Sequence, residues 1–114
     1  MSFETIQAYF EQFGMADRCM DLKESSATVA LAALALGTEE ARIAKTLSFL
    51  VEEAPVVIVA AGAARIDNHK YKIFFHKKPK MIPGEDCEKY IGHRPGGVCP
   101  FCLPPTAGIY LDIS

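Results

Sequence analysis

The most regular stretch of the chain runs from residue 46 to residue 61, where the spacing of apolar residues is that of β-strands. Apolar side chains first alternate with polar ones, at Leu47, Phe49 and Val51. An uninterrupted apolar run then covers residues 56–61, as in a fully buried strand, and Gly62 ends it. A turn at residues 52–55 separates the two segments. We therefore predict an antiparallel hairpin at the centre of a sheet.

Helical spacing marks the regions before this hairpin. Residues 3–13 carry an aromatic stripe and predict an amphipathic helix that packs on the sheet. Residues 17–22 are predicted as a short strand followed by a turn at 24–26. The Ala- and Leu-rich stretch 27–36 predicts a buried helix that Gly37 closes. Thr38 is the expected N-cap of another helix, which should carry Glu39 and Glu40 in its first turn and end near Lys45.

Shorter elements are predicted after the hairpin. Asp67 is a candidate N-cap for a helix through Phe74, although residues 73–75 also suit a strand. Residues 80–82 are a candidate strand, Pro83 begins a helix that Gly92 ends, and residues 109–113 form a last strand. A chain of 114 residues suffices for one hydrophobic core. We predict one domain, residues 1–114, of the α/β (α+β) class, with a mixed, mainly antiparallel sheet flanked by helices.

The composition is that of a globular protein with a true core, with 50% hydrophobic and 23% charged residues. The longest apolar run, residues 54–64, contains a proline and a glycine and is too short to span a bilayer. The N-terminus has neither the basic nor the apolar region of a secretory signal. We therefore expect a cytoplasmic protein with no membrane partner.

Charge is unevenly distributed although the formal net charge is only −2. Acidic residues predominate in the first half of the chain. Six basic residues lie between residues 65 and 80, against a single acidic residue there, namely Arg65, Lys70, Lys72, Lys77, Lys78 and Lys80. Such a polarised surface can dock a phosphate backbone on one side only.

A segment rich in glycine and proline, residues 92–101, is the strongest candidate for a functional element. Pro95 and Pro100 fix φ and lack an N–H, while Gly96 and Gly97 leave neighbouring backbone N–H groups unshielded. Such N–H groups can cradle a carbonyl oxygen, a phosphate or an oxyanion. The same pattern is also that of a tight turn between a helix and a strand, and taken alone it favours the turn.

Four cysteines permit other chemistry, but without an export signal we expect free thiols. Cys99 and Cys102 form a Cys-x-x-Cys motif. A redox motif of this kind normally opens a helix, which Pro104 and Pro105 disfavour here. A zinc site would also need Cys87 and His93, in a spacing that matches no zinc pattern we recognise. We interpret His93 as a solvated loop residue, with a general base as the alternative.

Two separated motifs together resemble the YbaK/prolyl-tRNA-editing family of aminoacyl-tRNA deacylases. The first is Ala44-Lys45-Thr46, which in that family leads from a helix into a strand. The second is the Gly-x-x-x-Pro loop from Gly96 to Pro100, which in that family faces the lysine. The similarity runs in order from about Ala27 to Asp112. It implies a YbaK-like fold that continues beyond Ser114 with another strand and a closing helix, so we expect a chain shortened at its C-terminus or a core left open.

The resemblance implies hydrolysis of the ester between an amino acid and the terminal ribose of a tRNA, by attack of water and without a metal or cofactor. Lys45 would hold a phosphate or the ester carbonyl, and the loop residues Gly96, Gly97, Val98 and Pro100 would stabilise the oxyanion. The residues expected to contact or shape the substrate are Thr46, Ser48, Phe49, Cys99, Phe101 and Asp112. The residues expected to dock the acceptor stem are Lys70, Lys72, Lys77, Lys78 and Lys80.

The expected substrate is a small amino acid mischarged on the proline tRNA or a similar one, and the expected partners are aminoacyl-tRNA and an aminoacyl-tRNA synthetase. Two other functions stay open. The same fold could bind tRNA or a synthetase without turnover, or Cys99 and Cys102 could serve a thiol redox protein. The sequence leaves the identity of the amino acid and the oligomeric state open.

Overall fold

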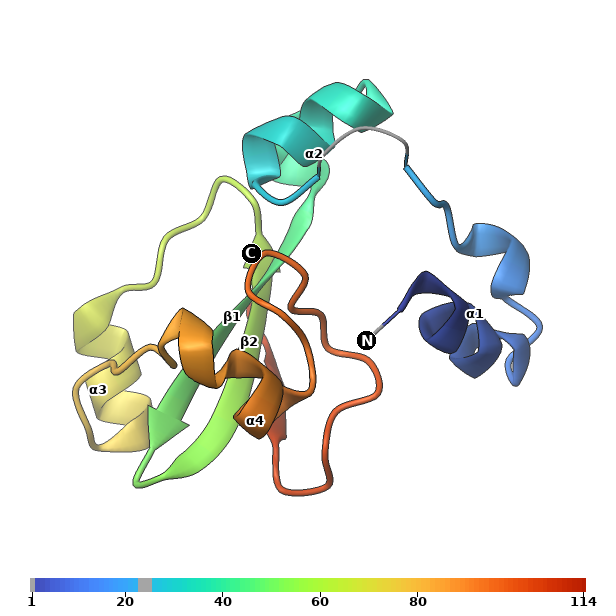
Figure 1. Ribbon diagram of the computed structural model, residues 1–114. Coiled ribbons are helices and arrows are strands. Elements are labelled where there is room, and N and C mark those ends of the chain that lie inside the picture. Colours follow the sequence, from blue (N-terminus) through green and yellow to red (C-terminus); the bar gives the residue numbers. More distant parts are fainter. Residues whose placement is uncertain (1, 23–25) are drawn as a thin grey trace.

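A three-stranded mixed sheet forms the centre of the molecule in the computed structural model, which describes residues 2–22 and 26–114 (Figure 1). Strands β1 (Ala44–Val51) and β2 (Ala54–Ala61) form an antiparallel hairpin. Strand β3 (Gly108–Leu111) lies parallel to β2 on the other side. The predicted fold class and hairpin are confirmed, with β2 as the middle strand of the order β1-β2-β3.

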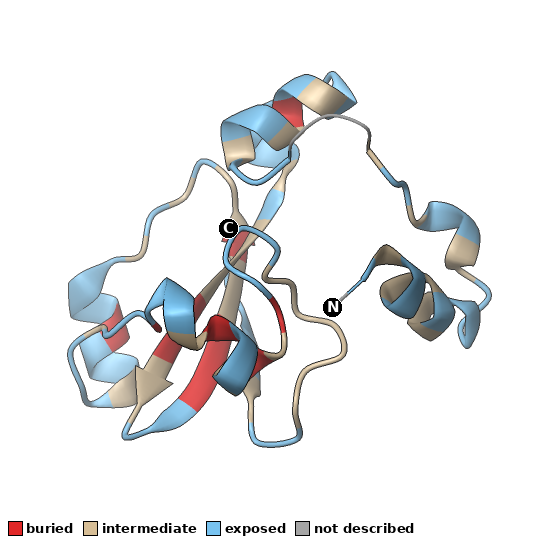
Figure 2. Ribbon diagram, viewed as in Figure 1, coloured by how far each residue is buried: buried red, intermediate tan, exposed pale blue. Residues whose placement is uncertain are grey.

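The two faces of the sheet bury separate clusters of side chains. Helix α3 (Asn68–Phe75) covers one face, where Tyr71 packs with Phe49 and Val56. Helix α4 (Cys87–Ile91) covers the other, where Ile91 packs with Val57 and two further buried residues, Ile82 and Cys87. Neighbouring residues of a strand point to opposite faces, and Val56 and Val57 therefore belong to different clusters. Figure 2 shows the buried residues concentrated in the hairpin and along α4.

The outer edge of β1 is partly covered by the segment before α4. The Leu50 amide donates to the Lys80 carbonyl at 2.9 Å, and the Ile82 amide donates to the Ser48 carbonyl at 3.1 Å. Met81 forms an isolated antiparallel bridge with Phe49. The segment predicted as a strand at residues 80–82 therefore contains a single β-bridge rather than a strand. The contacts nevertheless fix this segment, and with it the start of the helical region 84–91, against β1.

Helix caps account for several predicted boundaries. Helix α2 (Val29–Leu36) begins after Thr28, whose hydroxyl accepts from the Leu31 amide, and ends at Gly37 in the left-handed conformation. The predicted helix beginning at Pro83 is a 3₁₀ turn (Gly84–Asp86) that continues into α4, and left-handed Gly92 caps it as expected. Helix α3 begins at its predicted cap, because Asp67 Oδ1 accepts from the amides of His69 (2.9 Å) and Lys70 (3.0 Å).

The Asp67 cap predicts a specific acid dependence of stability. Hydrogen bonds from the Lys70 and His69 amides lower the pKa of the Asp67 carboxyl below its ordinary value of 3.8. The folded state thus binds this proton less readily than the unfolded state. The stabilisation is complete above about pH 4 and is lost as pH falls through the lower folded pKa. Urea unfolding between about pH 2 and pH 7 should show a weaker acid dependence for Asp67→Asn, and an unchanged one would contradict the assignment.

Helix α1 (Phe3–Glu11) is confirmed, but its aromatic stripe does not pack on the sheet as predicted. The rings of Tyr9 and Phe10 contact Phe101, with centroid distances of 6.1 and 4.6 Å. Figure 1 shows α1 to one side of the sheet. The strand predicted at 17–22 is wrong, because residues 16–18 form a 3₁₀ turn and residues 19–22 are irregular. Of the turn predicted at 24–26, Glu24 and Ser25 lie outside the described residues.

Two predictions around α2 are also wrong. Helix α2 is not buried, because it lies beyond the end of the hairpin and only Ala33 is fully covered, whereas Leu34 is 77% exposed. The helix predicted from Thr38 to near Lys45 is only a 3₁₀ turn (Glu40–Arg42), preceded by Glu39. Pairing with β2 already begins at Ala44, opposite Ala61, so strand formation overrides the helical signals. Lys45 is therefore a strand residue.

Among the described residues, no helix has both the length and the apolar character needed to cross a membrane.

Candidate active site

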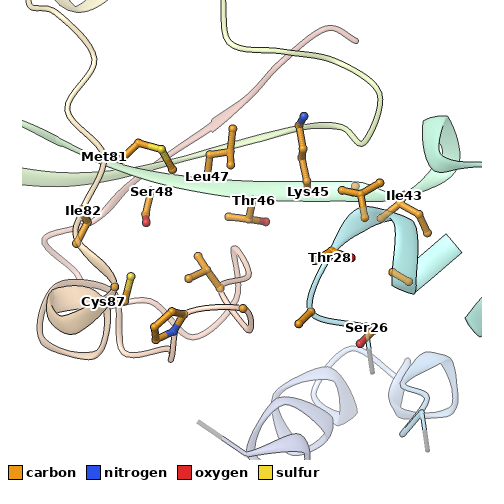
Figure 3. A pocket seen from close by; sticks show the side chains of 18 of the residues that line it. Ser26, Thr28, Ile43, Lys45, Thr46, Leu47, Ser48, Met81, Ile82 and Cys87 are labelled. Carbon is orange, nitrogen blue, oxygen red and sulfur yellow. The ribbon is translucent and has the colours of Figure 1, made fainter. Parts of the chain in front are cut away.

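A cleft of about 700 Å³ lies where the start of β1, the residues around the N-terminus of α2 and the glycine-rich loop meet (Figure 3). Ala27 and Thr28 line it on the α2 side, and Pro95, Gly96 and Val98 line it on the loop side. Its volume is within the range usual for small-molecule sites. The cleft brings together five of the predicted site residues, namely Lys45, Thr46, Ser48, Gly96 and Val98.

Alternation along β1 divides the predicted polar residues between two faces. Figure 3 shows Thr46 and Ser48 on the side of the strand that faces Cys87, and Lys45 and Leu47 rising from the other side. Ser48 is 5% exposed and pairs with Val57 of β2. The hydroxyl groups, rather than the lysine, are therefore directed toward the interior of the cleft.

The Lys45 ammonium is held by backbone carbonyl groups. Its Nζ donates to the Gly62 carbonyl at 3.3 Å and to the Ala64 carbonyl. The ion pairs among the described residues are Lys77–Glu52 and Arg94–Glu88, so no carboxylate in this part of the chain neutralises Lys45. Lys45 lines the cleft, but its side chain leaves β1 on the face opposite Thr46 and Ser48, and its ammonium lies at the Gly62 and Ala64 carbonyls.

The glycine-rich loop turns sharply at Arg94–Gly97. The Gly97 amide donates to the Arg94 carbonyl at 3.0 Å, and Gly96 has φ +85°. Pro95 at the second position and a left-handed glycine at the third are typical of a type II turn. The Gly97 amide is thus used inside the turn. Gly96 and Val98 line the cleft, and neither amide donates a backbone hydrogen bond within the described residues.

His93 is buried rather than solvated, which corrects our interpretation of it as a solvated loop residue. It is 2% exposed, and its Nε2 lies 2.8 Å from the Phe101 carbonyl and 3.5 Å from Cys99 Sγ. Because a carbonyl oxygen only accepts, Nε2 must carry the proton and donate it. This nitrogen therefore cannot take a proton from the Cys99 thiol, and the arrangement is not that of a catalytic Cys–His pair.

The Cys99 thiol lies in surroundings that do not favour its thiolate form. Burial raises the pKa of the Cys99 thiol above its ordinary value of 9.0, against a smaller opposing effect of a hydrogen bond with the Phe101 backbone. Cys19, Cys87, Cys99 and Cys102 are all free. Within residues 2–22 and 26–114, no group of three or more His, Cys, Asp or Glu side chains is arranged to hold a metal ion.

The raised pKa predicts slow alkylation of Cys99. At about pH 7.5 iodoacetamide should modify Cys99 in the folded protein more slowly than in the urea-unfolded chain, because less thiolate is present and the side chain is partly covered. Peptide mapping by mass spectrometry at several times would measure both rates. Faster reaction in the folded state would instead indicate an activated thiol and favour the redox alternative.

The other predicted site residues lie outside the cleft. Phe49 packs beneath α3 on the opposite face of the sheet. Asp112 lies in a groove on that same side, where a hydrogen bond from Ser114 lowers its pKa. Phe101 packs against α1. Gly97, Pro100 and Cys99 belong to the loop but do not line the cleft.

The basic residues proposed to dock tRNA extend from α3 into the segment after it. All five lysines are exposed, namely Lys70, Lys72, Lys77, Lys78 and Lys80. Lys72 and Lys78 line a shallow surface depression with His69. Lys77 pairs with Glu52 at 3.3 Å. These residues lie on the α3 side, so a polyanion bound there would have to pass around the edge of the sheet to enter the cleft.

Sequence reasoning missed several residues of the site. Thr28 and Ala27 line the cleft, and the polar residues before an apolar helix were an available N-cap signal for Thr28. Cys87 lines the floor of the cleft, although sequence analysis considered it only as a metal ligand. For the burial of His93 there was no local signal, because it depends on Phe101, eight residues further along.

The fold and the cleft together define a small α+β domain with a ligand site between a strand and a glycine-rich loop. A model of the family described as "Aminoacyl-tRNA editing domain" matches residues 23–114. The chain belongs to this family of editing domains.

The chain is also similar to individual proteins. The chain is 40% identical over 115 residues to the uncharacterized protein YwhH of Bacillus subtilis (strain 168), covering all of this chain and 73% of YwhH. A candidate trans-editing enzyme for prolyl-tRNA synthetase has a similar structure, with a TM-score of 0.79, 25% identity and coverage of 98% of this chain and 73% of that one. The hypothetical protein APE2540 gives a TM-score of 0.74 at 29% identity. Its match covers 82% of this chain, which spans only 63% of the APE2540 chain.

Proposed function

We propose that this protein is a freestanding trans-editing deacylase that hydrolyses the ester of mischarged aminoacyl-tRNA. The observation that carries the proposal is the cleft in which the hydroxyl-bearing face of β1 opposes the loop residues Gly96 and Val98. Membership of the editing-domain family and the likeness to a candidate trans-editing enzyme support the choice of substrate. The substrate we infer is a small amino acid on the proline tRNA or a similar tRNA, with prolyl-tRNA synthetase as the enzyme whose errors are corrected.

In the proposed reaction, water attacks the ester carbonyl carbon and the carbonyl oxygen becomes an oxyanion. The amides of Gly96 and Val98 donate to that oxygen, and one such donor typically contributes about 3 kcal/mol to the transition state. The bond from carbon to the ribose oxygen then breaks. The ribose oxygen takes up the proton that the attacking water releases, and the free amino acid leaves. Gly97 and Pro100 act indirectly in this proposal, by setting the shape of the loop.

The β1 side of the cleft positions the substrate in this proposal. Thr46 and Ser48 offer hydroxyl groups that donate or accept hydrogen bonds, and they contact the aminoacyl group or the terminal ribose. In this proposal the Lys45 side chain turns from the Gly62 and Ala64 carbonyls toward the cleft, and its ammonium binds a phosphate of the ligand. The apolar part of the lining selects the amino acid by size, at about 1–3 kcal/mol per methylene.

The test is release of labelled amino acid from a panel of mischarged tRNAs by the wild-type protein. We expect hydrolysis of one small mischarged amino acid and no hydrolysis of correctly charged tRNA. No release from any member of the panel, with tRNA binding retained, would contradict catalysis and leave a binding module of the same fold. Cys102→Ser should retain the activity, whereas a loss specific to this change would favour the thiol redox alternative.

A further inference from the structure

The buried position of His93 follows from the end of helix α4. Ile91 is fully buried against the sheet, and Gly92 adopts φ +82° as the left-handed C-cap. This conformation turns the chain inward immediately after the helix. The next residue is consequently only 2% exposed although it begins a loop, and the loop leaves the helix at a fixed angle.

One hydrogen bond closes the loop that follows. His93 Nε2 donates to the Phe101 carbonyl at 2.8 Å and so joins the two ends of residues 93–101. The glycine turn and Val98 lie inside this closed segment, and Val98 also packs on the buried cluster that contains Ile91. The backbone is thus held at its ends by the histidine and in its middle by apolar packing.

Phe101 is fixed by its side chain as well as by its carbonyl group. Its ring contacts Tyr9 and Phe10 of α1, with a centroid distance of 4.6 Å to Phe10. The acceptor of the histidine hydrogen bond therefore lies in a segment that a second element holds in place. A donor and an acceptor that are both immobilised can set the position of the peptide between them.

We infer that His93 is a positioning residue, whose Nε2–H···O bond to Phe101 holds the Gly96 and Val98 amides in the geometry that meets the substrate. His93 is not a catalytic residue in this inference, since it does not line the cleft and its proton is engaged by the carbonyl. The role in catalysis rests on the proposed function, whereas the effect on the loop does not. Loss of the bond should let the loop amides move out of this geometry while the sheet stays intact.

The experiment compares His93→Leu, which removes the donor, with His93→Gln, which keeps an N–H group at a similar reach. Arg94→Ala is the matched control, because Arg94 is the next residue and its exposed side chain only pairs with Glu88. We expect His93→Leu to accelerate amide hydrogen exchange at residues 96–98 with little change in β2. It should lower kcat for deacylation by about 100-fold, as for a misplaced catalytic group. His93→Gln should recover most of both effects, and Arg94→Ala should show neither.

Unchanged loop exchange and kcat in His93→Leu would overturn the inference, as would an equal loss of protection throughout the sheet. If His93→Leu does not fold, comparison of His93→Asn with His93→Gln tests the inference instead. The side-chain amide of asparagine is too short to reach the Phe101 carbonyl, whereas that of glutamine reaches it. Equal loop exchange in this pair would also overturn it. If the wild-type protein hydrolyses no aminoacyl-tRNA, the proposed function fails, and the exchange measurements alone still test the inferred hydrogen bond.

Discussion

Replacing Lys45 by alanine is expected to reduce hydrolysis of the mischarged tRNA by at least about 100-fold, the loss typical when one charged or hydrogen-bonding partner of the transition state is removed. The physical reason is that the positive charge of Lys45 is not neutralised. Its ammonium donates to carbonyl groups, and it forms no ion pair with a carboxylate of the described residues. A cation solvated only by dipoles keeps its attraction for a phosphate or a developing oxyanion. Lys45→Met, which keeps most of the aliphatic chain, should lose the same activity.

The Lys45 variants should remain folded. Each variant removes the ammonium that donates to the Gly62 and Ala64 carbonyls. Because this position is partly solvated, the free energy of unfolding should fall by only about 1 kcal/mol. Single-turnover rates and thermal unfolding measured on the same preparations separate the two effects. Lys89→Ala is the matched control, because Lys89 is an exposed lysine of α4 whose ammonium lies over the Tyr90 ring. Wild-type rates in both Lys45 variants would contradict the anchoring role.

Gly62→Ala is expected to lower the free energy of unfolding by about 3 kcal/mol, the upper end of the usual cost of overpacking. A Cβ at this position would lie 2.3 Å from the Glu40 carbonyl oxygen and 2.6 Å from a methyl group of Val29. The first contact is with backbone and cannot be relieved by a side-chain rotation. The Gly62 amide also donates to the Ile43 carbonyl. This hydrogen bond keeps Gly62 close to the segment that contains Glu40, so the backbone cannot easily move away to relieve the contact.

The same substitution should affect the site, because the Gly62 carbonyl accepts from Lys45 Nζ. We expect the melting temperature to fall by roughly 10 °C and the deacylation rate to fall even at temperatures where the variant is folded. Gly97→Ala is the control for stability, since its Cβ would meet only the Arg94 carbonyl oxygen at 3.6 Å, an ordinary contact. Equal melting temperatures for the two alanine variants would contradict the close packing at Gly62.

Particular residues show why some elements were predictable. Asp67 and Gly92 signal helix ends because each acts on backbone groups within four residues of itself. The hairpin was predictable because alternation in β1 and the apolar run in β2 are adjacent in sequence. Strand β3 was located correctly, but its parallel pairing with β2 was not readable, because 46 residues separate Ala61 from Gly108.

Two of the wrong predictions concern which surface an element meets. The apolar stretch of α2 predicts a buried helix, yet Leu34 is 77% exposed because α2 lies beyond the end of the hairpin. The aromatic stripe of α1 needs an apolar partner and finds it in Phe101 rather than in the sheet. The apolar residues of a segment indicate how much of its surface favours burial, but they do not indicate which other segment covers that surface.

By itself, the sequence determined the hairpin, the capped helices, the glycine turn and, through the Ala-Lys-Thr and Gly-x-x-x-Pro motifs, the editing-domain family. Each of these depends on local backbone preferences or on neighbouring segments. Only the tertiary structure decided that Thr46 and Ser48 face the cleft while the Lys45 ammonium points to Gly62 and Ala64. It likewise decided that His93 is buried. These outcomes depend on which distant segments cover each face of the sheet. The folded arrangement is the one that buries apolar surface and pairs polar groups best over the whole chain, so it cannot be deduced from any one segment.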